Sequence, residues 1–268
     1  MNRWLEFFSS SIYTAALLLS VMGLWFTVVI PGIDRWSRHF FISYFAVFLL
    51  CDLSVFLEGF FQLFIAPPAV FHVLLGLETL LLALPLLMVT IYLLHCCSED
   101  PRASKLLRAV LGLLAVYVLL IVCALFIDRF IRFLPDNRYE RGPLYPLLQT
   151  PILAILLLNL TATLRRRAFL SRKVFFSFLI AQLPMLATMI VQTFVEFFMF
   201  VAITYILSAL AMYSFILSDQ IEQDRCRQLE IARQQQEIAH QRARVMVLQM
   251  RPHFIYNTLM SIHSLCRL

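Results

Sequence analysis

Residues 107–127 read LRAVLGLLAVYVLLIVCALFI, a run in which Arg108 is the only charged residue. A helix of about 20 apolar residues is long enough to cross the hydrocarbon core of a bilayer. This stretch therefore predicts a transmembrane helix. Six further runs of this kind occupy about residues 11–30, 40–65, 70–96, 146–164, 173–193 and 197–217. We predict that residues 1–217 form an all-α, polytopic membrane domain of about seven transmembrane helices.

The composition supports a membrane protein over a soluble one. Hydrophobic residues make up 61% of the chain and charged residues 14%, and the mean hydropathy is +0.83. A soluble domain has far fewer apolar residues. The net charge of +6 could indicate nucleic-acid binding, but the arginines are spread over short loops, so we expect none. The six cysteines form no CxxC pair, and we expect neither disulfides nor a metal site.

Lysines and arginines in short loops indicate the orientation, because such loops tend to remain in the cytoplasm. With the N-terminus outside, the inner loops hold ten basic residues and the outer segments five. The inner ten are Arg35, Arg38, Arg102, Lys105, Arg108, Arg165, Arg166, Arg167, Arg172 and Lys173, and the outer five are Arg3, Arg129, Arg132, Arg138 and Arg141. We therefore predict an outer N-terminus and a cytoplasmic C-terminus. The segment from Asp128 to Pro146, the longest irregular one expected, is the candidate for an outer lid.

Three acidic residues, Asp52, Glu58 and Glu78, fall inside predicted spans. A carboxylate is costly in hydrocarbon unless it is paired or hydrated, so each indicates a functional site. Glu58 and Glu78 are expected at similar depth near the outer end of their spans. Gln62, one turn beyond Glu58, and His72, at the start of the third span, could complete a ligand-binding cavity open to the outside. The alternative is that these groups only hydrogen-bond between helices and hold the bundle together.

The composition changes abruptly after Leu217, where a charged and glutamine-rich segment without glycine or proline runs to residue 251. We predict that residues 218–251 form one cytosolic helix of roughly 50 Å, at ~1.5 Å per residue. Ile231, Ile238 and Val245 recur every seven residues, which is typical of a weak parallel coiled coil and predicts a homodimer. Such a helix suits signal transmission, although a solvated linker would have a similar sequence.

The segment that follows reads QMRPHFIYNTLMSI over residues 249–262. Pro252 lacks an amide hydrogen, so we expect it to end one helix and to begin another over residues 252–268. His253 then faces away from an apolar stripe that contains Phe254, Leu259 and Ile262. A solvent-facing imidazole with the Asn257 amide one turn away is suited to nucleophilic chemistry. The alternative is a histidine without a chemical role, either in a core or on the surface.

This segment resembles the phospho-acceptor box of sensor histidine kinases of the LytS/YehU type, whose pattern is Q-x-x-P-H-F-[LI]-[FY]-N-x-L-x-x-I. The matching residues are Gln249, Pro252, His253, Phe254, Ile255, Tyr256, Asn257, Leu259 and Ile262. The resemblance covers about the last twenty residues. Arg251 and Met260 stand where many relatives carry asparagine. It implies that His253 is the phospho-acceptor, that Asn257 orients it, and that a response regulator receives the phosphoryl group.

The resemblance also implies an ATP-binding lobe that uses magnesium and a second helix that completes a four-helix dimer bundle. All six glycines precede residue 143, so the glycine-rich loops of such a lobe do not follow His253. We expect ATP and Mg²⁺ to act only through that missing lobe, and this chain to be a fragment or truncated form that is inactive alone.

The sequence thus predicts a sensor histidine kinase, a two-component signalling protein of the bacterial inner (plasma) membrane. Two alternatives remain. The first is a transporter that uses Asp52, Glu58 and Glu78, which would have little use for the long tail and shows no internal repeat. The second is a receptor scaffold that dimerises without phosphate chemistry.

Overall fold

The computed structural model describes residues 2–62, 68–127, 129–133, 139–194 and 198–267. Within these ranges it contains seven long helices, and each includes a run long and apolar enough to cross a membrane. They are α1 (Asn2–Val29), α2 (Arg35–Gln62), α3 (Pro68–Cys96), α4 (Lys105–Phe126), α5 (Tyr145–Arg165), α6 (Arg172–Phe194) and α7 (Phe198–Cys266). The prediction of an all-α, polytopic bundle is confirmed. The chain is a multi-pass membrane protein.

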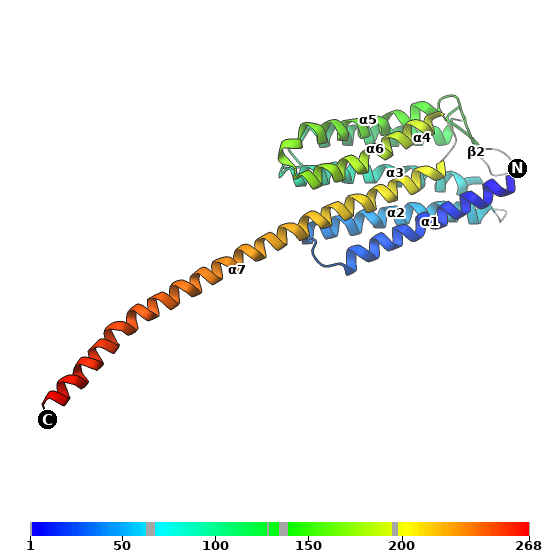
Figure 1. Cartoon of the computed structure of the whole chain (residues 1–268). Coiled ribbons are helices and arrows are strands. Elements are labelled where there is room, and N and C mark those ends of the chain that lie inside the picture. Colours follow the sequence, from blue (N-terminus) through cyan, green and yellow to red (C-terminus); the bar gives the residue numbers. More distant parts are fainter. Residues whose placement is uncertain (1, 63–67, 128, 134–138, 195–197, 268) are drawn as a thin grey trace. The chain divides into compact units, whose positions relative to one another are not determined.

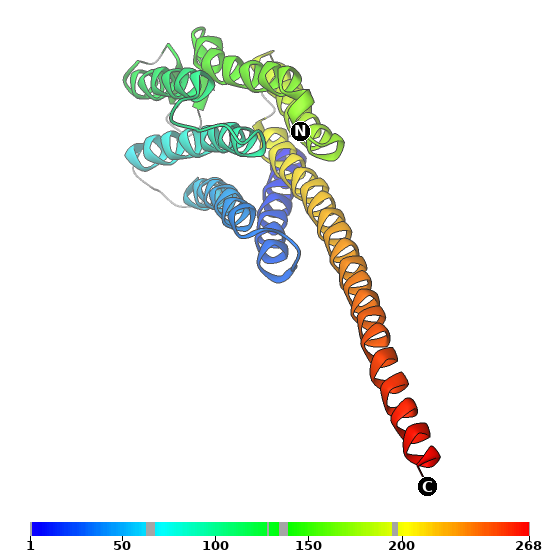
Figure 2. The same ribbon diagram turned by 90° about the vertical axis from the view of Figure 1, so that its left-hand side faces the viewer.

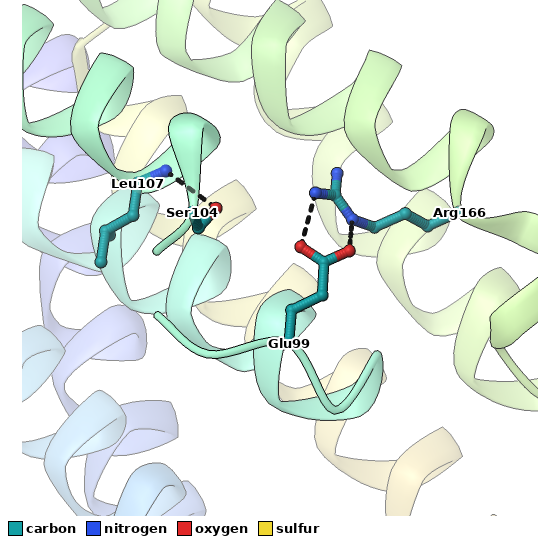
Figure 3. A network of polar contacts seen from close by, with 4 residues as sticks. All are labelled: Glu99, Ser104, Leu107 and Arg166. Atoms are coloured by element: carbon teal, nitrogen blue, oxygen red, sulfur yellow. Dashed lines mark hydrogen bonds and ion pairs between the residues drawn. The ribbon is translucent and has the colours of Figure 1, made fainter. Parts of the chain in front are cut away.

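Local caps set where two of these helices begin. The side chain of Asp34 accepts a hydrogen bond from the Ser37 amide at 3.0 Å, so α2 starts at Arg35, ahead of the apolar run that predicted it. Ser104 caps α4 in the same way, because its hydroxyl oxygen accepts from the Leu107 amide at 3.4 Å (Figure 3). Both caps satisfy amides that have no partner within the helix.

The helices pack in the order α1, α2, α3, and α3 in turn contacts α4 and α5, which pack with each other, while α6 packs on α5. Figures 1 and 2 show α3 lying between the α1–α2 pair and the group formed by α4, α5 and α6. Aromatic side chains fill the space between α2 and the first part of α7. The Tyr213 ring lies 5.2 Å from the Phe41 ring, and the Tyr205 ring lies 6.4 Å from the Phe48 ring.

The segment between α4 and α5 contains a β-hairpin, so the expectation of a wholly irregular loop is wrong. Strands β1 (Ile131–Phe133) and β2 (Tyr139–Arg141) pair antiparallel, with Ile131 opposite Arg141. Gly142 closes the base of the hairpin by donating its amide to the Phe130 carbonyl at 2.9 Å. A Cβ at Gly142 would collide with the Arg129 carbonyl, so this close approach requires glycine. Residues 128 and 134–138 of the predicted lid lie outside the described residues.

Helix α7 continues through Pro252, so the predicted helix break at this proline is also wrong. Proline removes one backbone hydrogen bond from a helix, but the bonds on either side can hold the backbone helical. Pro85 and Pro184 likewise lie inside α3 and α6. The chain forms two compact units, Met1–Asp219 and Gln220–Leu268, and the second consists of the remaining part of α7.

Candidate functional site

The histidine segment lies in the part of α7 that belongs to the second unit. The backbone of His253 is helical, while its side chain lies outside the described residues. Asn257 follows one turn later on the exposed surface of this unit, and its carbonyl accepts a hydrogen bond from the Ser261 hydroxyl at 2.9 Å. The helical spacing that places an amide one turn from the histidine is therefore present.

The apolar stripe expected on the side of the helix away from His253 is exposed within this unit. Phe254 and Leu265 expose 73% and 72% of their surface, and Ile255, Leu259 and Ile262 are also more than half exposed. Upstream, the seam residues Ile231, Ile238 and Val245 are exposed to about the same degree, at 54%, 50% and 51%. An amphipathic helix stabilises itself by covering such a stripe, so this surface is suited to a partner helix.

A second candidate site lies in the membrane unit, where the side chains of Glu58 on α2 and Glu78 on α3 hydrogen-bond to each other. Glu78 exposes only 2% of its surface, and Glu58 is half-buried. A hydrogen bond between two carboxyl groups needs a proton on one of them, so the pair can hold one proton between two helices. The remaining oxygen of Glu78, Oε1, has no hydrogen-bond partner in the described part of the chain.

Asp52 lies on a different face of α2 from Glu58, and it exposes 4% of its surface. Its Oδ2 accepts a hydrogen bond from the Ser20 hydroxyl of α1 at 2.6 Å. Asp52 also interacts electrostatically with Glu78, whose backbone carbonyl accepts from the Cys51 thiol at 3.9 Å. The three acidic residues singled out in the sequence are thus brought into one cluster by α2 and α3.

Helix α1 completes this acidic cluster with two residues that the sequence did not single out, Ser20 and Tyr13. Tyr13 interacts electrostatically with both Glu58 and Glu78. Gln62 and His72, which were expected to extend the site, lie in α2 and α3, but their side chains are outside the described residues. Among the described residues, no group of three or more His, Cys, Asp and Glu side chains could hold a metal ion. The carboxyl and hydroxyl groups of the cluster are suited to binding a proton or a hydrogen-bonding ligand.

Charged side chains make contacts outside the spans, beyond the last residues of α3 and α5. Glu99, which follows α3, receives two hydrogen bonds from Arg166 after α5, at 2.7 and 2.8 Å (Figure 3). The Arg166 hydrogen bonds hold the pKa of the Glu99 carboxyl below its ordinary value. Ser171, before α6, donates to the Asp219 carboxylate at 3.1 Å, which ties the α5–α6 connection to α7 at the end of the membrane unit.

No family model matches this chain, and neither a curated protein nor a solved structure matches it.

Proposed function

We propose that this chain is the membrane sensor and phospho-acceptor part of a two-component histidine kinase, with His253 as the residue that receives the phosphoryl group. The observation that carries the proposal is the combination of the Pro252-His253 segment with a helical surface that needs a partner. Phe254, Leu259 and Ile262 leave a continuous apolar stripe exposed next to the histidine. Pairing of this stripe with helices of a second copy would give the dimer that the family resemblance implies.

The chemistry asks for one well-placed nucleophile. A ring nitrogen of His253 would attack the γ-phosphorus of ATP, the new N–P bond would form as the bond to the bridging oxygen breaks, and ADP would leave. Most of the catalysis in phosphoryl transfer comes from positioning and charge stabilisation, so an adjacent amide such as Asn257 contributes by orienting the ring or the phosphate. ATP and magnesium would be bound by a separate catalytic lobe and not by the residues of this chain.

The membrane unit would supply the stimulus. We infer an outer N-terminus and a cytoplasmic C-terminus in a bacterial inner membrane, because basic residues are more numerous on the resulting inner side. In this orientation Glu58 and Glu78 lie toward the outer face. Helix α7 includes both the last span and His253, so a displacement of that span could be transmitted along the helix to the acceptor. A response regulator would then take the phosphoryl group.

The test is a labelling assay on the full chain in nanodiscs, with an active kinase lobe and a second bundle helix fused after Leu268. We expect labelled ATP to give an acid-labile, alkali-stable product. His253→Gln should abolish the label, and Asn257→Ala should reduce it. His263→Gln is the matched control, because His263 lies on the same helix about 80° around from His253, and it should retain the label. Loss of the label in His263→Gln with retention in His253→Gln would refute the assignment.

A second function, proton-coupled transport, is favoured by the hydrogen-bonded pair of Glu58 and Glu78. Transporters use buried carboxyls as proton relays. The discriminating experiment places the chain in proteoliposomes with a pH-sensitive dye inside and imposes a proton gradient. A proton flux that is present with the wild-type chain and lost in Glu78→Gln would favour a transporter. The same low proton permeability with the wild-type chain and with Glu78→Gln would favour the sensor.

A further inference from the structure

A cavity lies inside the membrane unit against Ile131 of the β-hairpin, and none of its lining residues belongs to the acidic cluster or to the histidine segment. Its volume is about 30 Å³, and α3, α4, α5, α6, α7 and Ile131 of the hairpin contribute its walls. Most of the lining is apolar, but six polar side chains also face it: Thr79, Tyr117, Tyr145, Gln149, Gln192 and Tyr205. An apolar cavity with a few convergent polar groups is the usual form of a small-molecule site.

Three of these polar side chains are buried without sufficient partners. Oε1 of Gln149, both Oε1 and Nε2 of Gln192, and the hydroxyl of Tyr205 have no hydrogen-bond partner in the described ranges. Their residues expose 7%, 1% and 0% of their surface. Burying a polar group without a partner destabilises a protein, and such groups are normally paired with protein, water or ligand. Three of them converging on one cavity therefore indicate an occupant.

The base of the hairpin lies beside the cavity, where Arg141 contacts two of the helices that line it. Arg141 donates from Nη1 to the backbone carbonyl of Gln192 at 2.6 Å, and its guanidinium lies 4.3 Å from the centre of the Tyr145 ring. The Tyr145 hydroxyl in turn accepts from Nε2 of Gln149 at 2.9 Å. Arg141 thus connects strand β2 to α5 and α6, two of the helices that carry the polar groups.

The available groups define the chemistry of the occupant. Gln149 and Gln192 offer amide oxygens as acceptors, the amide nitrogen of Gln192 offers donors, and the Tyr205 hydroxyl can do either. None of these groups carries a charge, and Arg141 is already engaged by a carbonyl and a ring. A charged ligand would lose its hydration here without gaining a counter-ion, which is unfavourable. A neutral ligand with both a donor and an acceptor fits better.

We propose that this cavity binds a small uncharged molecule with an amide-like head, held by Gln149, Gln192 and Tyr205 and bordered by Ile131 of β1. The present volume accommodates about two waters, so the ligand would displace them and the flexible Met189 side chain in the wall would move to make room. The proposal is independent of phosphate chemistry, because it concerns binding to the membrane unit alone.

Three isosteric probes test the proposal on the full chain in nanodiscs: acetamide, acetate and acetone. All three have four heavy atoms in one plane, but only acetamide is both neutral and able to donate and accept. Binding is followed by saturation-transfer NMR of their methyl protons, with empty nanodiscs subtracted. A ligand of four heavy atoms binds no tighter than tens of micromolar, roughly, so titration into the millimolar range is needed. We expect saturable binding of acetamide, about tenfold weaker binding of acetone, and no saturable binding of acetate.

Variants assign the binding to this cavity. Gln192→Leu should weaken acetamide binding by about tenfold, because two hydrogen bonds are lost. Tyr205→Phe removes a single oxygen without changing the shape, and it should weaken binding by about threefold even if the leucine variant fails to insert. Gln182→Leu is the control. Gln182 is buried like Gln192 and lies on the same helix, α6, but its side chain donates to Thr163 and does not line the cavity. Its replacement should therefore leave the affinity for acetamide unchanged.

Any of three results would overturn the proposal. One is the absence of saturable acetamide binding, which would mean that water alone fills the cavity. Another is acetate binding as tight as acetamide binding, which would contradict the argument from charge. The third is acetamide binding that Tyr205→Phe leaves unchanged, which would place the ligand elsewhere. Labelling of His253 bears on none of these results, so the failure of either proposal can be told from the failure of the other.

Discussion

The pair of Glu58 and Glu78 permits a quantitative test by a double-mutant cycle. The single variants are Glu58→Leu and Glu78→Leu, and the double variant combines them. Each single change removes one carboxyl and leaves the other without this hydrogen bond, whereas the double change replaces the pair with two apolar side chains of similar size. The hydrogen bond between α2 and α3 is therefore isolated as the coupling free energy of the cycle.

The structure fixes the expected sign and size of this coupling. Hydrogen bonds between transmembrane helices contribute about 0.6 kcal/mol on average and up to about 1.7 kcal/mol in such cycles. Because Glu78 is 2% exposed, we expect a favourable coupling toward the upper end, about 1–2 kcal/mol. Each single variant should destabilise the bundle by about 1–3 kcal/mol, since its partner carboxyl loses a hydrogen bond while buried. The double variant should be less destabilised than the sum.

Reversible unfolding in mixed micelles measures all four free energies of unfolding. A cycle of Glu58→Leu with Asn159→Ala is the control, because Asn159 lies on α5 and bonds to α3 at a different position, and its effects should be additive within about 0.5 kcal/mol. If both carboxyls were ionised and repelled each other, each single variant would be stabilising and the coupling would be unfavourable. That result, or a coupling of zero, would refute the hydrogen-bonded pair.

Three further predictions concern the membrane unit. Asn159→Ala should destabilise the bundle by about 1–3 kcal/mol, because it removes hydrogen bonds to Thr90 at 2.8 Å and to the Leu86 carbonyl at 3.1 Å, whereas the exposed Thr161→Val should have little effect on unfolding. The pKa of Glu99 is lowered in the folded chain, so the stabilisation by its carboxylate is present above the ordinary carboxyl pKa and is lost as the pH falls. The free energy of unfolding should therefore fall by about 1 kcal/mol or less on acid titration, and Glu99→Gln should lack this decrease. A decrease that persists in Glu99→Gln would assign it to another group. Reporter fusions at residues 140 and 170 should report the outside and the cytoplasm respectively, and the same compartment for both would contradict the inferred topology.

The sequence was sufficient to predict the seven helices because length and apolar composition alone determine whether a segment spans a bilayer. The ends were harder to locate. The start of α2 depends on a cap from Asp34, which lies outside the apolar run. The strands of the hairpin between α4 and α5 are too short to show an alternating pattern in the sequence. The predicted break at Pro252 failed because a proline makes a helix end favourable without making it necessary.

The acidic cluster was only partly predictable, for a different reason. Asp52, Glu58 and Glu78 stand out in an apolar sequence because charge there is rare. Their partners on α1, Ser20 and Tyr13, are ordinary residues of a span, and only the packing of α1 on α2 brings them near.

The cavity residues Gln149, Gln192 and Tyr205 were not predicted from the sequence, for the same reason. They are uncharged and lie on three different helices, so their convergence depends on tertiary contacts. A glutamine within an apolar span, as in α5 and α6, is a weak sequence signal that could have drawn attention to two of them.

The most direct test of the proposed function is to locate the phosphoryl group on the wild-type chain. The chain with its fused kinase lobe is incubated with ATP, kept at alkaline pH to preserve the phosphoramidate, and sequenced by electron-transfer fragmentation of its peptides. We expect the added mass to appear between the fragment that ends at Pro252 and the fragment that ends at His253. A phosphoryl group on His240 or His263, or an unmodified Pro252–Leu268 segment when the lobe is active on a reference substrate, would contradict it.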